Sequence, residues 1–165
     1  KIFNKQLPEQ GRSERRTKQL SNPFVTKLWL SLAIFDLILL WCIYVRVLSY
    51  KGTLVICDRY IKDTLLDFRK NFPDSNFEES IVWKLLEFLC PEPKHSFLLW
   101  VPVDESKRRS KEKNEPFPDD EETLNWRLER YMDESIFPRN RFELIDGRQP
   151  VETLTDYIHS RVVDR

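Results

Sequence analysis

Apolar side chains occur almost without interruption from Phe24 to Tyr50, which predicts a single long helix. Ser21 or Asn22 can cap its first turn, and Pro23 suits the first helical position because proline has no N–H to satisfy. Gly52 stands where a left-handed residue commonly ends a helix. The pattern therefore predicts both ends of this element.

The same stretch has a second interpretation, because Leu28 to Val45 approaches the length of a membrane span. A charged side chain, Asp36, lies at its midpoint, where it is costly in lipid. A strand-like segment also follows directly after Gly52. These two observations favour a helix buried in a protein core, and no membrane partner is expected. Asp36 would then pair with a cation or face a binding crevice.

A short apolar segment, Leu54 to Cys57, indicates a strand buried on both faces, as in a parallel sheet. Asp58, Arg59 and Tyr60 follow it directly. Ligands of open α/β sheets bind at the carboxyl ends of the strands, so these three side chains are expected at a functional site. An aspartate there can hold hydrated Mg²⁺, and the planar guanidinium fork of an arginine suits phosphate oxygens. A solvated ion pair without function is the alternative.

The rest of the chain alternates between helical and strand patterns. This order predicts an α/β protein with a three-layer parallel sheet and helices on both of its faces. The expected elements are a helix beginning at Asp63, Thr64 and Asp67, a helix from Glu78 to Leu89, a strand from His95 to Val103, a helix from Leu124 to Met132, a strand from Phe142 to Ile145 and a closing helix from Val151 to Val163.

Composition places limits on the class of protein. The 165 residues, 41% of them hydrophobic, are typical of one folded domain. The 27 basic and 27 acidic side chains cancel, which excludes a general attraction to nucleic acid. The three cysteines form no CxxC pair, and with two histidines they give no zinc-ligand spacing. Such cysteine usage suits a reducing cytoplasm.

Two charged segments lie outside these elements. The basic stretch Lys1 to Leu20 is either a connecting segment or an arm that holds an anionic substrate. The densest charge run, Asp104 to Asn114, is either a solvated helix face or part of a cation-bearing lid over about residues 104–117. Its position after an expected core strand raises the weight of the lid hypothesis.

In this order of elements the chain resembles the thymidylate kinase family of P-loop nucleoside monophosphate kinases. The matching features are the apolar helix with Asp36, the glycine before VICDRY, the strand running into VPVDESKRRSKEK, and ELIDG followed by a helix. The resemblance implies a single domain of the P-loop NTP hydrolase type, N-terminally incomplete, over residues 1–165. It implies transfer of the ATP γ-phosphoryl group to a nucleoside monophosphate, first of all dTMP to dTDP, with ATP and Mg²⁺ as cofactors. A homodimer would agree with it.

The resemblance also implies roles for individual residues. Asp58 would help to hold Mg²⁺ through water, Arg59 would bind the phosphate of the acceptor, and Tyr60 would shape the acceptor pocket. Asp36 and Asp63 would complete the substrate-binding set.

In the lid, Arg109 and Lys113 match the cations of the family. They would stabilise charge on the transferring phosphoryl group, whose transition state depends on positioning and electrostatics.

The sequence departs from the family in two ways. The phosphate cradle GxxxxGK[ST] is absent, because none of the three glycines has that spacing. The first strand, the P-loop and the first helix are therefore expected before Lys1, and the chain as given is not expected to use ATP productively. In addition, Ala33 and Leu37 stand where the family has base-contacting residues. Three alternatives stay open: a different phosphoryl acceptor, a catalytically inactive nucleotide-binding or scaffold protein, and a membrane-anchored protein.

Overall fold

The computed structural model describes residues 22–116 and 118–163. The chain divides into two compact units, Lys1–Glu92 and Pro93–Arg165. The basic segment Lys1 to Leu20 lies outside the described residues, as does Phe117 at the end of the predicted lid. The two hypotheses for the basic segment therefore stay predictions.

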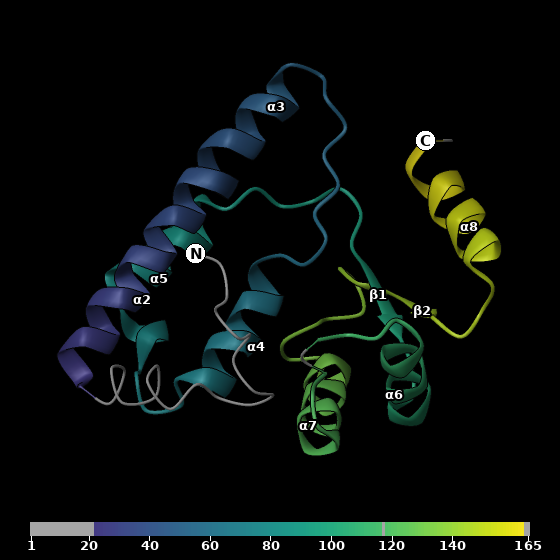
Figure 1. Ribbon diagram of the computed structural model, residues 1–165. Helices are drawn as coiled ribbons and strands as arrows, with labels where there is room; N and C mark the ends of the chain where they lie inside the picture. Colours follow the sequence, from purple (N-terminus) through teal and green to yellow (C-terminus); the bar gives the residue numbers. More distant parts are fainter. Residues whose placement is uncertain (1–21, 117, 164–165) are drawn as a thin grey trace, which may run out of the picture. The chain divides into compact units, whose positions relative to one another are not determined.

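The first unit begins with the long helix that the apolar run predicts (Figure 1). Its start is capped by Asn22, whose side-chain oxygen accepts a hydrogen bond of 3.0 Å from the backbone N–H of Phe24. Gly52 follows its end with φ of 76°, so both predicted ends are confirmed. The helix consists of α2 (Pro23–Leu37), the π-helical stretch η1 (Ile38–Val45) and α3 (Arg46–Tyr50).

Only one face of this helix is buried. It packs against α5 (Ile81–Leu89), and its most buried side chains are Leu30 and Ile34. The opposite face is exposed to solvent along its length and carries Asp36 among apolar side chains. Those exposed apolar side chains include Phe24, Leu28, Leu32, Phe35, Leu39, Leu40, Ile43 and Val47.

The helix Pro23–Tyr50, with 28 residues, is long and apolar enough to cross a membrane, a test that core helices of soluble proteins also pass. We expect Asp36 to keep the exposed face out of lipid, because a carboxylate at mid-helix must be desolvated there. Replacing Asp36 with leucine is then expected to raise the fraction of protein that floats with neutral lipid vesicles severalfold. Asp74→Leu, a change of an exposed loop residue, is the matched control and should leave flotation at the wild-type level. Strong flotation of the wild-type chain would instead support a membrane-anchored protein.

The core of the first unit is largely aromatic. Phe77 and Trp83 pack edge to face with ring centroids 4.9 Å apart, and Phe68 meets Phe77 at 5.3 Å. Trp83 and Leu86 are almost fully buried on α5, whose start is capped by the Ser80 hydroxyl accepting from the Trp83 N–H at 3.2 Å. The other two elements of this core are α4 (Ile61–Asn71) and η2 (Phe77–Glu79).

The second unit contains a parallel pair of strands, β1 (Phe97–Trp100) and β2 (Glu143–Asp146). Leu98 lies opposite Leu144 in the register, and Trp100 lies opposite Asp146. Both strands were predicted from the sequence and are confirmed, although each is short. Two helices stand between them in the chain and a third follows β2, namely α6 (Val103–Glu112), α7 (Glu121–Met132) and α8 (Val151–Val163).

The predicted fold class, a three-layer parallel sheet of the P-loop NTP hydrolase type, is wrong. The described residues are mostly helical, and they contain one sheet of two strands. The expected buried strand Leu54 to Cys57 does not form, and its Leu54 and Ile56 side chains are 65% and 85% exposed. A strand needs a neighbouring backbone to satisfy its amide and carbonyl groups, and none is hydrogen-bonded to this segment in the described chain.

Candidate functional site

The predicted site begins with Asp58 and Arg59, which lie in an irregular, exposed segment before α4. Arg59 has φ of 67°, in the left-handed region that side chains with a Cβ rarely occupy. The Arg59 side chain is 63% exposed, and its Nη1 lies 3.8 Å from the Asp67 carboxylate. An ion pair this long and this exposed contributes little to stability. Most of the Arg59 side chain is therefore accessible to solvent and to a ligand.

Tyr60 anchors the segment to the rest of the first unit. Its ring packs on Trp41 with centroids 4.8 Å apart. The hydroxyl donates a hydrogen bond to the Pro91 carbonyl at 3.0 Å and accepts one from the Cys90 thiol at 2.9 Å. Burial, together with the Cys90 hydrogen bond, raises the pKa of Tyr60. Because the hydroxyl stays protonated at neutral pH, Tyr60 serves as a positioning group rather than as a base.

The two other predicted substrate-binding residues of this unit have different surroundings. Asp63 caps α4, since its carboxylate accepts the Tyr60 backbone N–H at 3.1 Å. This contact places Asp63 within one helical turn of the Arg59 segment. Asp36 lies on the exposed face of α2.

The predicted lid residues belong to the second unit, where residues 103–112 form α6. Arg109 donates through Nε to Glu105 at 2.7 Å, and Glu105 also accepts from Arg108 at 2.7 Å. These hydrogen bonds lower the pKa of Glu105 to about 2. Lys113 is exposed at the end of the helix. Arg109 is thus neutralised on its own helix, and Lys113 offers its charge to solvent.

A further bond joins this helix to the next one. Lys107 of α6 contacts Glu121 of α7 at 2.6 Å, which links the two helices through their charged side chains.

The predicted site residues divide between the two units. The first unit contains Asp36, Asp58, Arg59, Tyr60 and Asp63, and the second contains Arg109 and Lys113.

The sequence reasoning missed a second polar cluster, at the carboxyl ends of β1 and β2. Asp146 binds the Arg148 guanidinium at 2.7 Å, and the guanidinium lies 5.1 Å from the ring centroid of Trp100. The bond lowers the pKa of Asp146 to about 2. Gly147 approaches β1 closely, because a Cβ there would lie 2.7 Å from Val101 Cγ2. An apolar strand closing in aspartate, as in ELIDG, is the same signal that drew attention to Asp58, and it could have found this cluster.

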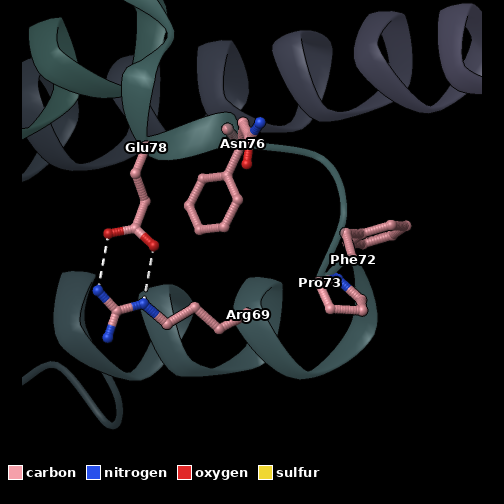
Figure 2. Close-up of a pocket in the computed structure, with 6 residues that line it drawn as sticks. Arg69, Phe72, Pro73, Asn76 and Glu78 are labelled. Carbon is pink, nitrogen blue, oxygen red and sulfur yellow. Dashed lines mark hydrogen bonds and ion pairs between the residues drawn. The ribbon is translucent and has the colours of Figure 1, made fainter.

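A shallow hollow of about 190 Å³ lies between α4 and η2 (Figure 2). Arg69 and Glu78 face each other there through two hydrogen bonds of 2.7 Å, and the pairing lowers the pKa of Glu78. Their charges pair with each other, and the remaining lining residues are Phe72, Pro73, Asn76 and Phe77, so the hollow offers a ligand both polar and apolar surface. Asp58 and Arg59 are not among its lining residues.

Within residues 22–116 and 118–163, no group of three or more histidine, cysteine or acidic side chains is arranged to hold a metal ion. A Mg²⁺ ion held by Asp58 could take its remaining ligands from a bound nucleotide and water. No protein-family model, curated protein or solved structure was found to match the chain. The resemblance to thymidylate kinases accordingly stays a prediction.

Proposed function

We propose that the chain takes part in phosphoryl transfer from Mg·ATP to a nucleoside monophosphate, with dTMP as the first candidate acceptor. The observation that carries this proposal is the exposed guanidinium of Arg59 on a segment anchored through Tyr60. An arginine fork binds two phosphate oxygens at once, and anchoring its backbone lowers the entropy lost on binding. Arg59 in this proposal binds the phosphate of the acceptor.

The neighbouring carboxylate supports the same assignment. Asp58 is exposed beside Arg59 and can orient water molecules of a Mg²⁺ ion that arrives with nucleotide phosphates. Such an ion keeps several of its waters and needs one or two protein carboxylates. The lid cations implied by the resemblance, Arg109 and Lys113, belong to the second unit, and the proposed binding of the acceptor by Arg59 does not depend on them.

Binding of the phosphoryl donor, ATP, needs a phosphate cradle, and the 165 residues contain no GxxxxGK[ST] motif that would form it. Acceptor binding is therefore the informative experiment for this chain. We would titrate dTMP, the other nucleoside monophosphates and inorganic phosphate by calorimetry, and then assay ADP release from Mg·ATP. Saturable binding of one monophosphate in preference to phosphate alone supports the proposal and names the acceptor. Equal binding of every anion, or none, contradicts it, and ADP release that depends on the bound monophosphate would establish the transfer itself.

Replacing Arg59 with alanine is expected to weaken acceptor binding about tenfold, since one charge-assisted phosphate contact on an exposed surface is worth about 1.4 kcal/mol. The fold should be unchanged, because the guanidinium is mostly exposed. Lys51→Ala is the matched control, because it also removes one exposed cation from the same unit. It should change the affinity for the acceptor by less than about twofold, since single exposed charges contribute little. Equal losses in both variants would mean that only net charge matters and that Arg59 is not the phosphate ligand.

A further inference from the structure

Two cysteines that are far apart in the sequence meet beside Tyr60. Cys42 lies buried in η1, and Cys90 is the residue that ends α5. The Cys90 thiol donates to the Tyr60 hydroxyl at 2.9 Å, and the Tyr60 ring packs on Trp41, the residue before Cys42. The two thiols also influence each other's pKa, as neighbouring groups do. We propose that Cys42 and Cys90 form an oxidation site, a thiol pair that a peroxide converts into an intramolecular disulfide. This inference does not depend on the proposed kinase function.

The backbone around the pair suits a bridge. Arg46, one helical turn after Cys42, donates through Nη2 to the Leu89 carbonyl at 2.6 Å, so the two segments are already tied next to the thiols. Cys90 itself has φ of −64° and ψ of 125°, so the backbone leaves the helix at this residue, although its N–H still donates to the Leu86 carbonyl at 2.9 Å. Disulfides require a narrow range of Cβ separations and torsions. Two thiols on segments that Arg46 ties together are expected to reach that range.

The covalent step balances with a peroxide as oxidant. The Cys90 thiol is the more accessible of the two, so its sulfur attacks one peroxide oxygen, the O–O bond breaks, and Cys90 sulfenic acid and water result. The Cys42 sulfur then attacks the sulfenic sulfur, the S–O bond breaks, and the hydroxyl leaves with the thiol proton as a second water. Two electrons pass from the thiols to the peroxide. Burial raises the pKa of both thiols, so the reaction should be faster at alkaline pH, where more thiolate is present.

The bridge would change the surroundings of Tyr60. In the thiol state the Tyr60 hydroxyl receives a hydrogen bond from Cys90 and gives one to Pro91. A disulfide has no S–H, so oxidation removes the first bond and leaves the second. The redox state of the two cysteines therefore determines how many hydrogen bonds hold Tyr60, the residue next to Arg59.

The third cysteine provides the matched control. Cys57 is exposed and could react with peroxide or with a second chain, so the experiment uses Cys57→Ser as its parent. Folded Cys57→Ser protein would be treated with hydrogen peroxide, quenched with an alkylating agent and analysed by non-reducing peptide mapping. We expect both remaining thiols to be lost together and a peptide linked through Cys42 and Cys90 to appear. Its mass should be two hydrogens lower than that of the separate peptides, and dithiothreitol should reduce the link. The same treatment in urea should give much slower bridging, because the two cysteines are then no longer neighbours.

Two results would overturn the proposal. One is recovery of both thiols as free, alkylated cysteines after peroxide treatment of the folded protein. The other is oxidation of Cys90 to sulfinic acid with Cys42 still free, which would mean that the sulfurs cannot meet. Cys42→Ser and Cys90→Ser in the same background each retain one thiol and should give no linked peptide. The mapping of the Cys57→Ser parent needs neither variant, so the test does not depend on how well either one folds.

Discussion

Replacing Trp83 with alanine is expected to lower the free energy of unfolding by about 3–5 kcal/mol, the usual range for deleting a large aromatic side chain from a core. Trp83 is 1% exposed and touches Phe77 and Phe68, with centroids 4.9 and 6.1 Å away. Its removal leaves a cavity between α5, α4 and η2 that the rigid neighbouring rings cannot fill. Urea unfolding followed by far-UV circular dichroism measures the loss.

Phe88→Ala is the control for this experiment. Phe88 lies on the same helix, but it is 84% exposed, so its truncation should change the free energy of unfolding by less than about 0.5 kcal/mol. If both variants were equally destabilised, the loss would reflect the helix itself rather than the aromatic core. Trp83→Phe, which keeps a ring in the core, should lie between the wild type and Trp83→Ala.

The long helix could be predicted because its signals are local. Asn22 and Pro23 start it, Gly52 follows its end, and the intervening residues are nearly all apolar. Which face of a helix is buried depends on its neighbours and was harder to predict. In the helix predicted from Glu78 to Leu89, the apolar positions at helical spacing are Ile81, Val82, Leu85, Leu86 and Leu89. Of these, Leu86 is fully buried, but Ile81 is 83% exposed, and the buried ring is that of Trp83.

The error in fold class has one physical origin. Leu54 to Cys57 has the composition of a buried strand, and the predicted sheet was built around it. Composition alone does not supply the neighbouring strands that make a sheet, whereas β1 and β2 pair with each other in the second unit. The prediction was therefore right where two apolar segments could pair and wrong where one stood alone.

The candidate site was predictable in part. The exposed pair Asp58 and Arg59 was selected from sequence, since charged residues directly after an apolar run are a local signal. The anchoring of Tyr60 was not predictable, because its hydroxyl partners Cys90 and Pro91 lie 30 and 31 residues further along the chain. Contacts at such separations follow from tertiary packing.

The contacts between Tyr60 and Cys90 lie in a buried environment that should also make the stability of the protein sensitive to alkaline pH. Burial raises the pKa of Cys90 from 9.0 to about 11, so the folded state holds the thiol proton after the unfolded chain has released it. The stabilisation is complete below pH 9, and it is lost as the pH rises to about 11. A shift of this size at a partly buried side chain corresponds to roughly 2 kcal/mol, after a discount for solvent screening. The raised pKa of Tyr60 acts in the same direction at still higher pH.

The measurement is urea unfolding under reducing conditions at several pH values between neutrality and pH 11, with Cys90→Ser as the decisive variant. Serine keeps a donor for the Tyr60 hydroxyl but has no thiol proton to lose, so its free energy of unfolding should fall less over this range. Cys57→Ser removes an exposed thiol and should follow the wild type more closely. Because other groups also titrate here, the difference between wild type and Cys90→Ser isolates the thiol. Parallel curves for these two proteins would show that Cys90 ionises equally in the folded and unfolded states, and that burial does not hold its proton.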